Sequence, residues 1–398
     1  MLSQVDSLPP AGGDLPLFRA GFRPFFLLSG VQAALSVPAW LAQALNGLDL
    51  RLDYAPVLWH GHEMAFGFAA AAVAGFLLTA VPNWTGAKPL SGKPLAALTA
   101  LWVAARLAFA VGGALPPWVA AALALPFLPV LAAVLARPLL AAGKLRNIAF
   151  LPILAVLTAA QGLVLAEMVG IGGWGRQGLY LGLFVLLLLI TVVGGRIIPG
   201  FTVNGLRQRN TVVQPRSSPW LDGASIGSLV VAAVVWLMMP DSPAAGALAI
   251  LSGLLNAARL TGWCGLRTAG VPLLWVLHLA YAWLPVGLVL LGLSCFVASF
   301  TPQMASHALT AGCIGLMTLG VMSRAALGHS GRPLLAAPLT AAAYVLVSLA
   351  AVVRVFGVMI DPSAGLMLSG LLWSGGFALY VAVYAPICLT PRADGRPG

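Results

Sequence analysis

The sequence predicts an all-α integral membrane protein, and its composition and the length of its apolar blocks carry that prediction. Of 398 residues, 60% are hydrophobic and only 8% are charged, and the mean hydropathy is +0.98. Soluble domains carry about 25% charged residues, so this chain has too few to cover a surface in water. The apolar residues gather in blocks of about 20, the length with which a helix crosses a bilayer. These features exclude a water-soluble protein, a disordered chain and a disulfide scaffold.

Charged and Pro- or Gly-rich breaks divide the chain into twelve apolar segments. Lipid requires backbone polar groups to be satisfied internally, which favours helices, and runs such as 179–193 lack the alternation of transmembrane strands. We expect helices near residues 25–45, 57–80, 95–113, 117–136, 147–168, 178–199, 221–239, 244–260, 271–298, 305–326, 334–356 and 364–388. They should form a single membrane domain over 1–398, in which a cytoplasmic loop over 200–220 separates six helices from six. Pro199 is expected to end the sixth helix.

The basic residues predict the orientation of these helices. Loops on one side hold seventeen of the 21 Lys and Arg residues, and loops on the other side hold only Arg51 and Arg176. Cytoplasmic loops carry such an excess, so both termini should be cytoplasmic. Arg106 and Arg354 fall inside predicted helices. The net charge of +11 is therefore an orientation signal, and we expect the bilayer as a partner and no nucleic acid.

The five histidines are the main candidates for chemistry, because an ionisable residue inside the membrane is costly unless it has a partner. The predicted orientation places His60, His62 and His307 near the outer face. His278 falls in the inner third of the ninth helix, and His329 in a cytoplasmic turn, where a solvated or capping role is expected. Each could be a hydrogen-bonded structural residue, but three at one face, beside a carboxylate, favour a metal site.

The spacing of the donors indicates which of them act together. On a regular helix His60, Glu63 and Met64 share a face, as do Met304 and His307. Imidazole and thioether groups suit haem iron or copper. The sequence therefore predicts a metal site with ligands from the second and tenth helices.

Three further residues are predicted to support this site or a second one. His62 points about 200° away from His60, so it would serve a second site or support the first. Tyr281 shares a face with His278, and Tyr281 and Trp59 are expected to contact the cofactor.

Arg106 has two alternative roles. It could pair with Glu63 on the neighbouring helix, which would bury two charges that neither could bury alone. It could instead clamp an anion, such as a haem propionate, with two hydrogen bonds. In that case Glu63 would be a proton carrier or a ligand, and Glu167 could join either arrangement.

Several stretches together resemble the NnrS family of bacterial membrane proteins. The matching stretches are Leu17–Phe26 (LFRAGFRPFF), Trp59–Met64 (WHGHEM), Gly75–Trp84 (GFLLTAVPNW), Gly194–Thr202 (GGRIIPGFT), Leu277–Trp283 (LHLAYAW) and His307–Arg332. All five histidines lie inside them. The resemblance implies a multi-pass protein of the bacterial cytoplasmic membrane that contains haem and copper. It also implies a link to nitric oxide and denitrification, in protection from nitrosative stress.

The number of histidines limits the analogy to haem–copper oxidases. Haem–copper oxidases use about six histidines, whereas this chain has five, so a single haem, or a haem plus a copper with mixed His, Met and Glu ligands, fits better. No CxxCH motif is present, so a haem would be non-covalent and of b type.

We expect a haem or copper protein that binds or reduces nitric oxide near the periplasmic face. His60 and His307 would be the metal ligands, with His278 a weaker candidate because of its depth. Reduction would make the protein an oxidoreductase and would need protons and an electron donor, a quinol or a cytochrome, but no electron-accepting domain is evident. The alternative is a transporter or copper-handling protein, in which Met64, Met304 and the same two histidines pass copper on.

Overall fold

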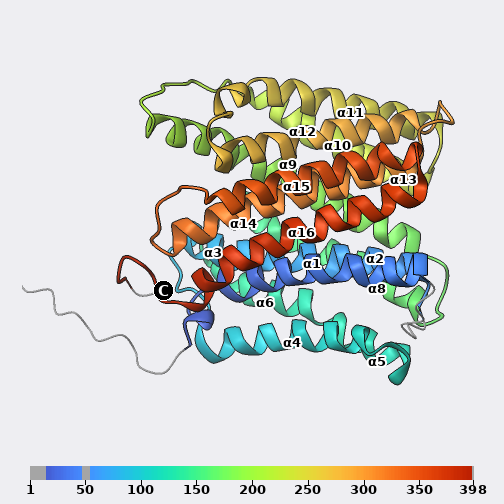
Figure 1. The fold of residues 1–398 in the computed structure, drawn as a ribbon, viewed down its shortest axis with the longest axis horizontal. Helices are drawn as coiled ribbons and strands as arrows, with labels where there is room; N and C mark the ends of the chain where they lie inside the picture. The colour runs from blue at the N-terminus through green and yellow to red at the C-terminus, as the bar shows by residue number, and fades with distance from the viewer. Residues whose placement is uncertain (1–14, 47–53, 397–398) are drawn as a thin grey trace, which may run out of the picture.

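The computed structural model describes residues 15–46 and 54–396, and over this part of the chain it contains helices and no strands (Figure 1). Twelve helical stretches are long and apolar enough to cross a membrane, which confirms the all-α fold class and the number of spans. Arg51, which the orientation argument used, lies outside the described residues. The helical stretches are Phe22–Ala44, Pro56–Thr85, Gly92–Ala110, Pro117–Ala141, Leu145–Met168, Gly175–Arg207, Pro219–Met238, Pro243–Thr261, Pro272–Leu293, Pro302–His329, Pro338–Met359 and Pro362–Leu389.

The helices lie roughly parallel to one another, and helices distant in sequence pack side by side (Figure 1). The first helix, α1 (Phe22–Asn46), packs along the last, α16 (Pro362–Leu389), which in turn packs against α15 (Pro338–Val355). One continuous hydrophobic core runs from Phe22 to Ile387. The other long helices are α4 (Gly92–Ala110), α5 (Pro117–Ala124), α6 (Phe127–Ala141), α8 (Phe150–Met168), α9 (Gly175–Arg207), α10 (Pro219–Met238), α11 (Pro243–Thr261) and α12 (Pro272–Leu293).

Three predicted boundaries are wrong, and one of them is the end of the second span, which continues to Thr85 rather than ending near residue 80. Helix α9 continues through Pro199 to Arg207, so the loop before α10 is shorter than the predicted 200–220. A proline inside a membrane helix removes one backbone hydrogen bond, and neighbouring groups in a packed bundle can satisfy the freed carbonyl. Helix α12 ends at Leu293 rather than near residue 298.

Two spans change their helical geometry partway through. The second span consists of α2 (Pro56–His62), a π-helical segment η2 (Glu63–Ala69) and α3 (Ala70–Thr85). The tenth consists of α13 (Pro302–His307), a π-helical segment η5 (Ala308–Gly315) and α14 (Leu316–His329). Each π segment begins directly after a histidine that the sequence singled out. Short π segments are common at functional sites, and a regular helix had been expected at both places.

Arg23 joins the two ends of the chain. Its fully buried guanidinium donates to the carbonyls of Cys388 at 3.0 Å and Thr390 at 2.6 Å, at the C-terminal end of α16. A cation is favourable there because the helix dipole is negative at that end. His329 lies in the same region, where its ring contacts Phe22 with 5.9 Å between centroids.

The segment after α16 continues this end cluster. Arg392 donates to the carbonyl of His329 at 2.7 Å and pairs with Asp394 at 2.6 Å. The hydrogen bonds from Arg392 lower the pKa of Asp394 to about 2. His329 thus contributes a ring contact and a backbone acceptor to the end of the bundle.

The predicted orientation can be tested with single cysteines in a variant that lacks the four native ones. Ser91→Cys and Gly173→Cys lie in exposed loops at opposite ends of the bundle. We expect a membrane-impermeant maleimide, applied to spheroplasts, to label Gly173→Cys and to label Ser91→Cys only after the membrane is permeabilised. The reverse pattern would contradict cytoplasmic termini.

Candidate functional site

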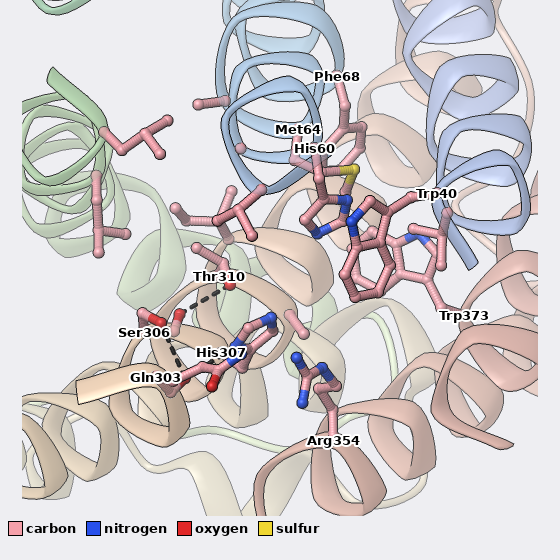
Figure 2. Close-up of a pocket in the computed structure, with 18 of the residues that line it drawn as sticks. Trp40, His60, Met64, Phe68, Gln303, Ser306, His307, Thr310, Arg354 and Trp373 are labelled. Atoms are coloured by element: carbon pink, nitrogen blue, oxygen red, sulfur yellow. Dashed lines mark hydrogen bonds between the residues drawn. The ribbon is translucent and has the colours of Figure 1, made fainter. Parts of the chain in front are cut away.

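A cavity of about 730 Å³ lies among six of the spans, and we call it the main cavity. Its walls come from α1, α2 with η2, α9, α13 with η5, α15 and α16 (Figure 2). Helices α2 and α13 begin at the end of the bundle opposite the C terminus (Figure 1). This is the end that the charge distribution assigns to the outer face.

One wall of the main cavity carries His60 and Met64. The His60 ring stacks on Trp40, with 4.6 Å between centroids and 29° between planes. Its Nδ1 atom is buried and has no hydrogen-bond partner among the described residues. The Met64 sulfur accepts a hydrogen bond from Ser36 at 3.3 Å. A nitrogen and a sulfur donor therefore line the same wall.

The facing wall carries His307 and Arg354 (Figure 2). His307 Nδ1 lies 2.8 Å from the carbonyl oxygen of Gln303, and because a carbonyl only accepts, Nδ1 carries the proton. Nε2 is left as the nitrogen with a free lone pair. Metal-binding histidines are commonly oriented in this way, by a hydrogen bond from the other ring nitrogen to a backbone carbonyl.

Arg354 lies one residue before the end of α15 and lines the main cavity. No acceptor among the described residues forms a hydrogen bond or an ion pair with its guanidinium. A guanidinium in a largely apolar cavity is costly without an anion. The cavity therefore combines two histidines with a cation that no acidic side chain among residues 15–46 and 54–396 neutralises.

Glu63 forms a buried cluster away from this cavity. Its carboxylate accepts from Gln32 at 2.7 Å and from His62 Nδ1 at 3.0 Å, and it lies 3.5 Å from the Arg106 guanidinium. His62 Nε2 lies 3.3 Å from the Gln161 amide, so both ring nitrogens are engaged. Of the two roles considered for Arg106, the structure has the ion pair.

Glu63 contacts α1 on the same side as His60 and Met64, since Gln32, Ser36 and Trp40, four residues apart on α1, contact Glu63, Met64 and His60 in turn. Glu63 nevertheless does not line the main cavity, because Gln32, His62 and Arg106 surround its carboxylate. Gly67, inside η2, makes room for the cluster, since a Cβ there would lie 2.6 Å from the Arg106 guanidinium.

Other predicted residues lie outside the main cavity. Met304 and Trp59 are buried but are not among the residues that line it. Glu167 accepts from the Gly175 backbone N–H at the start of α9, so it joins neither Arg106 nor Glu63.

His278 and Tyr281 belong to separate polar contacts among α9 to α12. His278 Nε2 lies 2.8 Å from the Thr202 hydroxyl. The Tyr281 hydroxyl donates to Asn256 at 2.7 Å and accepts from Arg259 at 3.0 Å. The sequence spacing predicted that His278 and Tyr281 share one face of a helix. Their hydrogen-bond partners come from α9 and α11.

Arg259, which the sequence assigned to a cytoplasmic loop, is buried inside the bundle. Its guanidinium donates to Asp222 at 2.6 Å and to the Thr191 carbonyl at 2.7 Å. It occupies the space above Gly195 of α9, where a Cβ would overlap it. The two glycines at 194–195 thus accommodate a buried charge network.

Within the described residues, no three His, Cys, Asp or Glu side chains gather as a metal-binding group. A metal in the main cavity would have His60, His307 and Met64 as its available donors. Sequence reasoning missed the roles of Trp40 and Arg354 there, and Arg354 carried a usable signal because the count of basic residues in loops left only Arg354 and Arg106 unassigned.

The Glu63–Arg106 pair can be tested with a double-mutant cycle. We expect Glu63→Gln and Arg106→Met each to lower the free energy of unfolding by about 3–5 kcal/mol, because each leaves a buried charge or polar group unpaired. The double variant should lose clearly less than the sum. Unfolding in mixed micelles measures these energies, and additive losses would contradict a direct interaction.

The Gly195–Arg259 contact makes a second test, with a control on the same helix. In Gly195→Ala the new methyl group displaces the guanidinium, and we expect a loss of at least about 2 kcal/mol because hydrogen bonds to charged groups are broken. Nothing lies within 4 Å of a Cβ at Gly200, so Gly200→Ala should be neutral or stabilising by under about 1 kcal/mol. Equal melting temperatures in detergent for the two variants would contradict this interpretation.

The chain was compared with known proteins. A search of curated proteins finds no match. A family model described as NnrS protein matches residues 16–392, which cover α1 to α16 and both walls of the main cavity. The resemblance carried by the sequence motifs is thereby confirmed, and the chain belongs to the NnrS protein family.

Proposed function

We propose that the main cavity holds a b-type haem and that the protein binds nitric oxide there, as part of a response to nitrosative stress in the bacterial inner membrane. The observation that carries this proposal is Arg354, whose guanidinium has no acidic partner in the part of the chain that the structure describes, in a cavity that His60 and His307 line from facing walls. A haem needs these three features together: axial nitrogen donors, a cation for its propionates, and an apolar space for its ring.

The residues fit a haem in chemistry and in space. His307 Nδ1 is hydrogen-bonded to the Gln303 carbonyl, which leaves Nε2 free, and the buried Nδ1 of His60 has no partner among the described residues. Trp40, Phe68 and Trp373 line the same space and provide flat apolar surfaces. The volume of about 730 Å³ lies in the range of about 300–1,000 Å³ that ligand sites occupy.

Each residue would have a defined task in this site. His60 and His307 would hold the haem iron, which supplies the binding site for nitric oxide when the group is bound. Arg354 would bind a propionate, the role that the sequence offered to Arg106. The apolar walls would exclude water from the bound gas, and turnover would require an external electron donor.

Copper handling is the second candidate function, and Met64 is the observation that favours it. A thioether and an imidazole on one cavity wall are donors that suit Cu(I). Glu63 does not add to this set, because Gln32, His62 and Arg106 already bind its carboxylate. A copper in the main cavity would therefore use the same histidines as the haem, and metal analysis distinguishes the two occupants.

The absorption spectrum of the purified protein tests the haem proposal. We expect a Soret band and a split reduced α-band that change on addition of nitric oxide. His60→Ala and His307→Ala should lose or shift these bands, whereas His329→Ala should keep them because His329 lies at the other end of the bundle. A colourless protein with stoichiometric copper would overturn the proposal in favour of copper handling.

Arg354 provides a quantitative test. Arg354→Met should weaken haem retention about 10–100-fold, since a hydrogen bond to a charged group contributes about 1.5–3 kcal/mol. Arg207→Met, at an exposed position, is the control. Haem transfer to apomyoglobin measures the affinity, and equal transfer from both variants would exclude Arg354 as the propionate ligand.

A further inference from the structure

A second cavity of about 90 Å³ adjoins the main one, and we call it the secondary cavity. It lies among α1, α3, α9 and α14. Among its described lining residues Thr318 carries the single hydroxyl, and all others are apolar. A buried water needs two to four polar partners, and an apolar cavity without them stays dry. Water is therefore a poor occupant of this space.

The two cavities meet on three spans at the same level. Ala69, Leu186 and Ile314 line both cavities. On each of these spans the residues before the shared position line the main cavity, and those after it line the secondary cavity. Ala69 ends η2 and Ile314 is the last residue but one of η5, so the junction lies where the two π segments return to α-helix.

The secondary cavity extends from this junction away from the main cavity, toward the C-terminal ends of α3 and α14. Its lining continues from Ala69 to Leu77 on α3 and from Ile314 to Met322 on α14. At 1.5 Å per residue each stretch covers about 12 Å, roughly two fifths of the hydrocarbon thickness. Ala69 lies nine residues after His60 and Ile314 seven after His307, so the cavity begins about 10–14 Å from the histidines and extends further into the bundle.

Several lining side chains are only partly buried, including Val73 and Phe76 on α3 and Ile190 and Val193 on α9. These residues lie within membrane spans, so what reaches them from outside the protein is lipid. Helix α9 packs against η2 and η5 above the junction, whereas its packing with α3 and α14 below the junction is weaker, which leaves space there. The secondary cavity thus borders the hydrocarbon on one side and the main cavity on the other.

We propose that the secondary cavity binds small apolar gas molecules and conducts them from the bilayer to the main cavity. A diatomic gas dissolves in hydrocarbon, needs no hydrogen-bond partner and fits a dry cavity; apolar cavities of roughly 150 Å³ bind xenon or benzene. The gas-binding part of this proposal rests on the secondary cavity alone, and the delivery part rests on the proposed function.

Xenon is a probe for the gas site that does not involve haem. Crystals of the full chain under xenon pressure should show xenon in the secondary cavity. Ala72→Phe should remove it, because Ala72 is buried and lines the cavity, and Ala133→Phe should not, because Ala133 is exposed on α6. Absence of xenon from the wild-type cavity, or ordered water in its place, would overturn the gas site whether or not the protein holds haem.

Ligand kinetics test the delivery route. After flash photolysis, the bimolecular rate of carbon monoxide binding to the haem should fall several-fold in Ala72→Phe and stay unchanged in Ala133→Phe. Val193→Phe, at a partly exposed position, is a milder second variant that should act in the same direction. Unchanged rates in folded variants that have lost their xenon would overturn the route, while an unaltered Soret band shows that the haem site is intact.

Discussion

The cost of an ionic charge inside the membrane organises this structure. An ion in hydrocarbon has no water to solvate it, so each buried charge must find a partner in the protein. Arg106 lies beside Glu63, Arg259 pairs with Asp222, and Arg23 donates to the carbonyls at the end of α16. These partners come from distant parts of the sequence and therefore fix which helices lie next to one another. Arg354 has no such partner within residues 15–46 and 54–396, and for that reason it is the strongest indication of an anionic ligand.

The π segments separate two environments that lie next to each other in the sequence. His60 and Met64 face the main cavity, while His62 and Glu63 face the ion-pair cluster. The wider turn makes this division possible without breaking the span. Its backbone is supported from neighbouring helices, since Trp102 donates to the Gly67 carbonyl at 3.2 Å and Ser29 to the Phe68 carbonyl at 3.0 Å. Side chains of α1 and α4 thus help to hold the π geometry in place.

The sequence predicted the spans well and the site only in part. Hydropathy and charge depend on composition alone, which is why the number of spans could be predicted without knowledge of packing. Reasoning from helical spacing placed Met64 and Glu63 beside His60, but it could not show that an ion pair with Arg106 keeps Glu63 out of the main cavity. The difference between Arg106 and Arg354 was not predictable, because each is a single arginine in an apolar helix. Only the neighbouring helices determine that one meets a carboxylate and the other a cavity.

The arrangement of the two cavities bears on how an apolar ligand would reach the site. A gas concentrated in the bilayer meets the lipid-facing side of the bundle before it meets water-exposed parts of the protein, and in the proposed route it would enter between the partly buried residues of α3 and α9 that line the secondary cavity. Polar lining side chains such as Gln303, Ser306 and Arg354 lie in the main cavity instead. Polar and apolar lining residues therefore belong to different cavities. In the proposed function, ionic groups of the ligand would be bound near one face of the membrane, and an apolar reactant would arrive from the middle of the membrane. The proposed nitric oxide site needs this division, because a path that admitted water would place polar competitors beside the gas.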